Sequence, residues 1–248
     1  MLTLFHTLVA FHIVFGAVGL VCFWVPVLGR KGSPNHRLWG KIFARTILMA
    51  GFIAVLLSLC TLIDPLSTHP HLKDPVFVRG IFGIMMFYLA ILTINLAWYG
   101  VETLKNKANH RANRRGLNLF LQPILIVAAL GCALEGILIG QLLMVVISIV
   151  GFATAGTNLF FMFTPNPAPL TYLKEHVKAI VGAGISVYTA FFAFGAVRIM
   201  PTIALHPVLW AIPLITGLGI ILYHHRQIRL RLEAHSTSQS NKSLGLGF

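Results

Sequence analysis

The feature that most constrains this chain is a series of long apolar stretches separated by short polar segments. A membrane-spanning helix needs about 20 mostly apolar residues, because lipid offers no partner for a backbone N–H or C=O group. This rule predicts an all-α integral membrane bundle of seven transmembrane helices. The spans are expected at Leu2–Leu28, Lys41–Ile63, Val76–Val101, Leu117–Ile137, Gln141–Phe163, His176–Ile199 and Pro207–His225.

The composition agrees with a chain that lies in lipid. Of its 248 residues, 57% are hydrophobic and 10% are charged, whereas a soluble domain carries about 25% charged residues. The net charge of +13 would suggest a nucleic-acid partner in a soluble protein. Here the basic residues lie in the short segments between apolar stretches. We therefore predict contact with a bilayer that contains anionic lipids, and no nucleic-acid partner.

The distribution of lysine and arginine predicts the orientation of the chain. The segments after the first, third, fifth and seventh predicted spans are rich in basic residues, and the alternate segments are poor in them. Basic loops favour the cytoplasmic side. We therefore expect the N-terminus outside and the C-terminus in the cytoplasm. The basic residues on the cytoplasmic side are Arg30, Lys31, Arg37, Lys41, Lys105, Lys107, Arg111, Arg114, Arg115, Lys174, Lys178, Arg226, Arg229 and Arg231.

The domain organisation is predicted to be simple. Residues 1–231 are expected to form one seven-helix domain, and residues 232–248, which are mostly small and polar, a flexible cytoplasmic tail. Small residues recur at three- and four-residue spacing in the sixth predicted span, which favours close packing with another helix. They are Ala179, Ala183, Ser186, Ala190 and Ala193.

Histidines are the main candidates for chemistry. His36, His110 and His176 each lie near the cytoplasmic start of an even-numbered predicted span, and therefore at similar depth. If those spans are neighbours, the three imidazoles could bind a transition metal, or two of them could be axial ligands of a b-type haem. The alternative is that these histidines cap helices and meet lipid phosphate.

Two further histidines extend the set of candidate haem ligands. His12 is expected about 13–15 Å inside the outer surface at 1.5 Å per residue, where an imidazole needs a partner. The candidate partners on neighbouring helices are Asn95, Thr157 and Asn158. His206 precedes the seventh predicted span near the outer face. A haem would take two ligands from His12, His36, His110, His176 and His206.

Several kinds of chemistry leave no signature in this sequence. No acidic residue falls near the middle of a predicted span, although a proton-coupled transporter usually needs a buried carboxylate relay. There is no phosphate-binding glycine loop, no G-x-S-x-G elbow and no H-E-x-x-H sequence. These absences count against a proton-coupled transporter and against enzymes that use these motifs, and they leave the histidines as the main candidates for a function.

Two segments carry a family resemblance. The stretch HIVFGAVGLVCFWVPVLGRKGSPNHRLWGKIF joins His12 to the loop residues Lys31, Gly32, His36 and Arg37 at fixed spacing, and EHVKAIVGAGISVYTAF with WAIPLITG lies near the other end. Together they resemble a bacterial family of multi-pass predicted membrane proteins with a domain of unknown function. The resemblance implies a helical bundle and an inner-membrane location, without a reaction.

Three functional hypotheses follow. The first is a bacterial inner-membrane protein that binds haem or a metal ion through histidines in a redox role. The second is a non-enzymatic transporter-like or assembly subunit, with a membrane protein partner and structural histidines. The third is a membrane hydrolase with histidine-bound zinc.

Overall fold

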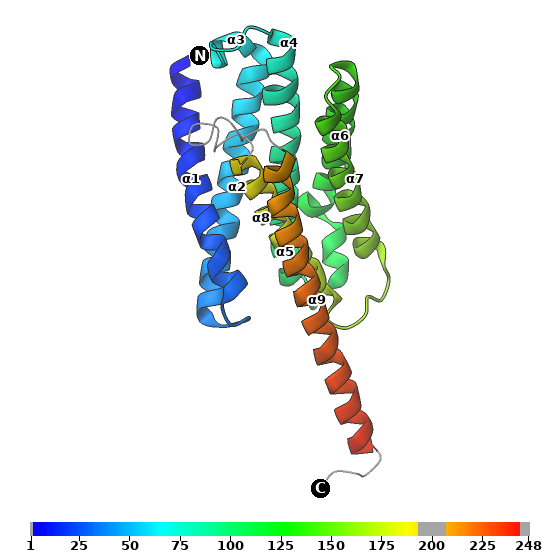
Figure 1. Ribbon diagram of the computed structural model, residues 1–248. Helices are drawn as coiled ribbons and strands as arrows, with labels where there is room; N and C mark the ends of the chain where they lie inside the picture. The colour runs from blue at the N-terminus through cyan, green and yellow to red at the C-terminus, as the bar shows by residue number, and fades with distance from the viewer. Residues whose placement is uncertain (1, 193–206, 244–248) are drawn as a thin grey trace.

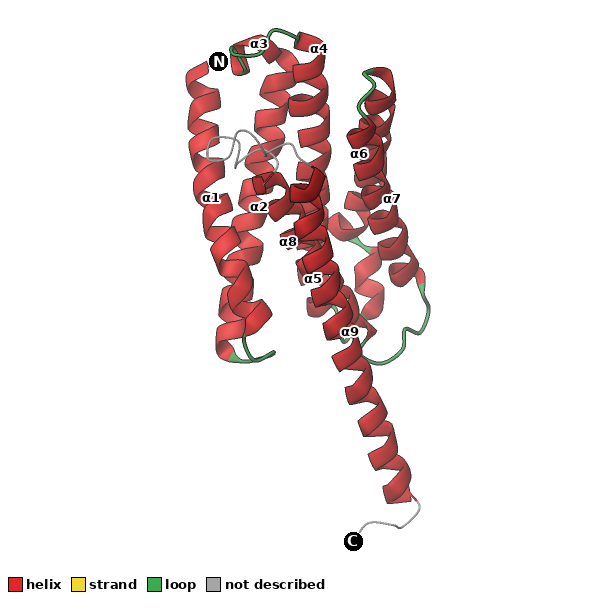
Figure 2. Ribbon diagram, in the orientation of Figure 1, coloured by secondary structure: helices red, strands yellow, loops and turns green. Residues whose placement is uncertain are grey.

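The computed structural model describes residues 2–192 and 207–243, with side chains for residues 2–192, 209 and 211–234. Within this part of the chain all regular structure is helical, without strands (Figure 2). The elements are α1 (Leu2–Leu28), α2 (Pro34–Ile63), α3 (Pro65–Thr68), α4 (Pro75–Val78), the π-helix η1 (Arg79–Met85), α5 (Met86–Lys105), the 3₁₀-helix η2 (His110–Arg114), α6 (Gly116–Leu138), α7 (Leu142–Phe163), α8 (Thr171–Ala190) and α9 (Pro207–Ser243).

Five helical segments of the described residues are long and apolar enough to cross a membrane. They are α1, α2, the continuous segment Pro75–Lys105, α6 and α7. The predicted all-helical architecture, with several helices able to span a membrane, is confirmed among the described residues. The sixth and seventh predicted spans correspond to α8 and α9, and residues 193–199 of the sixth lie outside the described residues.

The long helices form one bundle arranged around α5 (Figure 1). α5 contacts α2, α6 and α8. α1 pairs with α2 on one side, α7 pairs with α6 on the other, and α9 packs against α8. The N-terminus and the described end of α9 lie at opposite ends of the molecule (Figure 1).

α2 begins earlier than its apolar pattern predicts. Its first turn is polar, but Ser33 caps the helix by accepting a hydrogen bond from the His36 backbone N–H at 3.2 Å, and Pro34 occupies the first turn. A serine cap followed by proline is a strong helix start. The helix therefore begins at Pro34 rather than Lys41, and Asn35, His36 and Arg37 are helical.

The turn predicted between the fourth and fifth spans is confirmed. α6 ends at Leu138 and α7 begins at Leu142. Gly140 adopts φ +68°, which a residue with a side chain rarely tolerates. The backbone N–H of Gln141 then donates to Gly136 O at 2.7 Å, closing the turn.

The small residues of α8 pack against α5 as the spacing predicted. Ala179 and Ala183 are fully buried, and Ser186 is buried. A Cβ added to Gly100 of α5 would lie 2.9 Å from Ile180 and 3.2 Å from Ala179, so the two helices touch closely here. Ala190 is half-buried, and Ala193 lies outside the described residues.

Two features of the helices were not expected. A π-helical segment, η1, interrupts the third span over Arg79–Met85. α9 continues past Arg231 to Ser243, so most of the segment expected to form a tail is helical. The mobility of residues 232–248 stays a prediction.

Candidate functional site

His12 joins two helices through a backbone carbonyl. It lies on α1, and its Nδ1 donates to Ala50 O of α2 at 3.0 Å. The expected need for a partner on a neighbouring helix is met, but by a carbonyl rather than by Asn95, Thr157 or Asn158. The bond holds α1 and α2 in register inside the bundle.

His36 and Lys31 meet at the end of α1. Nδ1 of His36 donates to Pro26 O at 3.1 Å, and Lys31 Nζ donates to Pro26 O at 2.7 Å and Val27 O at 2.5 Å. The last carbonyls of a helix have no partner within it. Both side chains therefore cap α1, and burial lowers the pKa of the Lys31 ammonium group in this loop.

His176 makes the corresponding bond between α8 and α5. Its Nδ1 donates to Gly100 O at 2.7 Å. The glycine allows α8 to approach closely, since Ala179 and Ile180 occupy the space of its missing side chain. The inward orientation predicted from the small-residue face of the sixth span agrees with this position.

These three hydrogen bonds impose the same tautomer on His12, His36 and His176. A carbonyl oxygen only accepts hydrogen bonds, so Nδ1 must carry the proton. The neutral imidazole then has its lone pair on Nε2. Proteins usually orient a histidine that binds metal through one ring nitrogen by a hydrogen bond from its other ring nitrogen, often to a backbone carbonyl. Here Nδ1 makes that bond and Nε2 is the nitrogen left for a metal.

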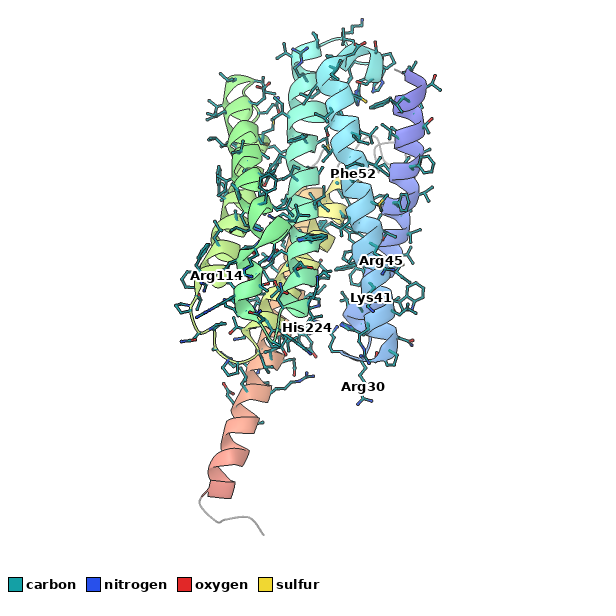
Figure 3. All side chains as sticks on the ribbon, turned by 180° about the vertical axis from the view of Figure 1, so that it is seen from behind. Arg30, Lys41, Arg45, Phe52, Arg114 and His224 are labelled. Atoms are coloured by element: carbon teal, nitrogen blue, oxygen red, sulfur yellow. The ribbon has the colours of Figure 1, made fainter. Side chains whose placement is uncertain are left out.

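Two of the candidates lie close together at the end of the bundle that carries the basic loops. His36 interacts electrostatically with His176 of α8 and with His224 of α9. Figure 3 shows His224 in the same half of the molecule as Arg30, Lys41 and Arg114. His224 was absent from the predicted site.

The other candidates lie elsewhere. His110 is in η2, with its ring 4.7 Å from Phe161 of α7, and its buried Nε2 has no hydrogen-bond partner. His206 lies outside the described residues. Among residues 2–192 and 207–243, no group of three or more His, Cys, Asp or Glu side chains is placed to hold a metal ion. Metal binding by His36, His110 and His176 stays a prediction.

A buried amide cluster was missed by the sequence analysis. Asn95 of α5, Gln122 of α6 and Asn158 of α7 are fully buried. Asn158 Nδ2 donates to Asn95 Oδ1 at 3.1 Å and to Gln122 Oε1 at 3.3 Å, and Asn95 Nδ2 donates to Gln122 Oε1 at 3.2 Å. The signal available was an amide side chain five or six residues from the end of each of three apolar spans, at the ends expected on the same side of the membrane.

A second polar group links α8 to α5 and α7. Glu175 accepts hydrogen bonds from Tyr99 Oη at 2.7 Å and from Lys178 Nζ at 2.5 Å. Lys178 also donates to Thr157 Oγ1 at 3.2 Å. Both hydrogen bonds to Glu175 end on Oε2, and they join α8 to α5 and, through Lys178, to α7, which fits a structural role.

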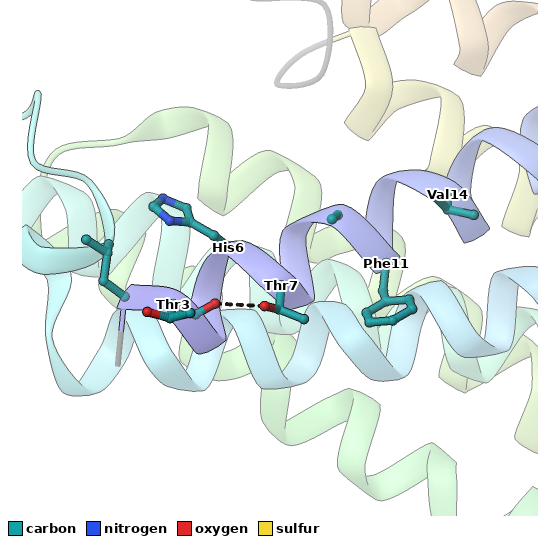
Figure 4. Close-up of a pocket in the computed structure, with 7 residues that line it drawn as sticks. Thr3, His6, Thr7, Phe11 and Val14 are labelled. Carbon is teal, nitrogen blue, oxygen red and sulfur yellow. Dashed lines mark hydrogen bonds between the residues drawn. The ribbon is translucent and has the colours of Figure 1, made fainter.

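A groove of about 540 Å³ lies along the outer face of α1 (Figure 4). Every residue that lines it comes from this one helix, including Thr3, His6, Thr7, Phe11 and Val14. Its one internal hydrogen bond joins Thr7 Oγ1 to Thr3 O at 2.9 Å. Because a single helix forms it, the groove is an external surface and adds no converging polar groups.

Comparisons with protein-family models, curated proteins and solved structures give no match for this chain. The resemblance to a family of multi-pass predicted membrane proteins stays a prediction. Arguments about function therefore depend on the residues and their geometry.

Proposed function

We propose that this chain is a bacterial inner-membrane protein that binds haem or a transition metal through His36 and His176 and has a redox role. The observation that carries the proposal is the shared hydrogen bonding of the two imidazoles. Each donates Nδ1–H to a backbone carbonyl, and each keeps an Nε2 lone pair for a ligand bond. A charge on His36 would also act on His176, so the two imidazoles lie within electrostatic range of each other.

We also propose that seven helices cross the membrane, with the N-terminus outside and the C-terminus in the cytoplasm. Five segments are apolar enough to span, and α8 and α9 would supply the remaining two. The α1–α2 loop and the α5–α6 loop carry basic residues and lie at the same end of the bundle (Figure 3). Positive charge of this kind favours the cytoplasmic side.

The topology is tested with two matched cysteine substitutions in a variant without Cys22, Cys60 and Cys132. Lys73 and Lys107 are both exposed loop lysines, on opposite sides of the proposed membrane. In intact cells, a membrane-impermeant maleimide should label Lys73→Cys, and Lys107→Cys only after the membrane is opened. The reverse pattern would overturn the orientation.

Cofactor binding is tested on the full chain purified in detergent. We expect a visible absorption band that shifts on reduction if haem is bound, or stoichiometric metal by elemental analysis. His176→Asn keeps an N–H donor near the position of Nδ1 but removes Nε2, whereas His176→Gln has its amide farther out. If His176 binds a cofactor, the asparagine variant should fold as stably as wild type and lose the cofactor.

A non-enzymatic transporter-like or assembly subunit is the second candidate. It is favoured by the structural role of the same hydrogen bonds, which tie α1 to α2 and α5 to α8. In that case purified protein would carry neither chromophore nor metal, and His176→Asn would behave like wild type. Colourless protein with stoichiometric zinc would instead support a zinc hydrolase.

A further inference from the structure

An apolar pocket of about 170 Å³ lies between α1, α8 and α9. Its wall includes Phe23 and Trp24 of α1, Tyr188 of α8, and Pro213 and Ile220 of α9. The indole and phenol groups in the wall are already paired, since Trp24 Nε1 donates to Tyr188 Oη at 2.6 Å and Tyr188 Oη donates to Leu20 O at 2.8 Å. The pocket therefore suits an apolar occupant.

The pocket is too small for a haem or a drug-sized ligand, which need about 300–1,000 Å³. Two residues on its border, Ile212 and Thr216, are exposed at the surface of the bundle. A flexible hydrocarbon chain can enter such a pocket from the side and fill it with part of its length.

The pocket leads into a basic region. Thr216, Ile220 and His224 follow one another at four-residue spacing, so they share one face of α9. On α1, Trp24 lies one turn before the end of the helix, and Lys31 caps that end. The space between the two helices is thus apolar at Trp24 and Ile220, and basic at Lys31 and His224.

The basic region brings several positive groups together. The groups that act electrostatically on His224 are Lys31, His225, His36 and Arg231, and all of them are basic. Among the described residues, Lys31 forms no ion pair with a carboxylate. Its hydrogen bonds to Pro26 O and Val27 O use two of the three ammonium protons. One N–H remains for an anion.

We propose that this site binds an anionic phospholipid of the membrane, with an acyl chain in the pocket and the phosphate at Lys31 and His224. The two chemistries lie in the order that a lipid requires, with the apolar part deeper in the membrane and the basic part at the interface. The cytoplasmic leaflet supplies anionic headgroups at this depth. The phosphate is assigned to Lys31 and His224, and the proposed ligand nitrogens are those of His36 and His176.

The experiment is native mass spectrometry of the delipidated full chain in detergent, with added phosphatidylglycerol or phosphatidylcholine of the same acyl chains. One lysine near an anionic surface contributes about 1 kcal/mol, which is about fivefold in affinity. We therefore expect Lys31→Gln to weaken phosphatidylglycerol binding about fivefold and to leave phosphatidylcholine unchanged. Glutamine keeps N–H donors for the carbonyls at the end of α1.

Two control variants separate binding at this site from nonspecific attraction of anionic lipid to the basic protein. Arg30→Gln removes the same charge from the neighbouring exposed position and should leave phosphatidylglycerol binding unchanged. Thr216→Phe should fill the pocket and weaken both lipids, whereas Ile215→Phe, on the exposed side of α9, should weaken neither.

The proposal is overturned if Lys31→Gln and Arg30→Gln have equal effects, or if the wild-type chain binds both lipids equally. Competition by free inorganic phosphate, together with no effect of Thr216→Phe, would also overturn it and assign the basic region to a soluble anion. Metal content and absorption of the same samples report separately on His36 and His176.

Discussion

Asn158 of α7 donates its side-chain amide to the amide oxygen of Asn95 on α5 at 3.1 Å, although α7 packs mainly against α6. Gln122 of α6 accepts from both amides and completes the cluster. Because lipid tails are as apolar as the side chains they touch, hydrophobic burial does little to select helix partners in a membrane. Interhelical amide bonds of this kind specify which helices meet.

The amide cluster should be energetically coupled. Asn95→Leu and Asn158→Leu should each lower the free energy of unfolding in detergent by about 1–2 kcal/mol, since each leaves a buried amide without a partner. In a double-mutant cycle we expect a coupling energy of about 0.6 kcal/mol or more. If the losses of stability in Asn95→Leu and Asn158→Leu simply added in the double variant, a direct bond between the two amides would be contradicted. Asn35→Leu at the exposed start of α2 serves as the control.

Gly184 should tolerate no side chain. An added Cβ would lie 2.3 Å from the Phe23 ring, which is 4% exposed and held between Trp24, Phe43 and Tyr188. Gly184→Ala should therefore lower the free energy of unfolding by about 1–3 kcal/mol.

The matched control for this substitution is Gly16→Ala in α1, where an added Cβ meets no atom within 4 Å. It should leave stability unchanged or raise it by about 0.5–1 kcal/mol, because alanine favours the helix. Thermal unfolding of the two variants in detergent makes the comparison. Equal Tm values would show that α8 does not press on Phe23.

The two lysine–glutamate pairs should differ in strength. Lys178 and Glu175 have side chains 24% and 16% exposed, whereas Lys105 beside Glu102 is 70% exposed. The two glutamates are equally shielded, with Glu102 17% exposed, so the pairs differ in their lysines. Lys178→Gln should lower the free energy of unfolding by about 1–3 kcal/mol, because the cation that it removes is itself largely shielded from water. Lys105→Gln should cost less than about 1 kcal/mol. A larger loss from Lys105→Gln would reverse this order.

The end of the bundle that carries the N-terminus should become less stable in acid. His69 lies in the loop after α3, with its ring 4.3 Å from Phe82 and 5.9 Å from Phe5. Burial lowers its pKa from 6.5, and the nearby His71 lowers it further. The unfolded chain thus takes up a proton at higher pH than the folded chain does. Stability should be complete above pH 6.5 and fall as the pH decreases below it.

This pH dependence is measured as Tm between pH 7.5 and pH 5 on wild type and two variants. His69→Phe keeps an aromatic ring on Phe82 and should reduce the slope. Thr68→Val removes the hydroxyl that bonds His69 Nδ1 at 3.1 Å but keeps the titrating ring, so the slope should remain. An unchanged slope in His69→Phe would exclude His69 as its source.

The sequence alone was sufficient to place five helices that can span a membrane, the turn at Gly140 and the small residues of α8. These features are local, because a bilayer demands about 20 apolar residues whose backbone groups are satisfied within one helix. The small-residue face of the sixth predicted span also predicted that His176 faces another helix, and it bonds Gly100 O of α5. Apolar content alone predicts that α2 begins at Lys41, seven residues after its observed start at Pro34. The difference arises because the Ser33 cap stabilises a polar first turn.

Only the tertiary structure decided which group each polar side chain meets. His12 bonds Ala50 O, His176 bonds Gly100 O, and Asn95 and Asn158 bond each other. A bond between two helices depends on the rotation and axial register of both. The registers follow from close contacts such as that of Gly100 with α8, between residues far apart in the chain. Apolar length determines that a helix crosses the membrane, whereas packing of the whole bundle determines which atoms it presents to its neighbours.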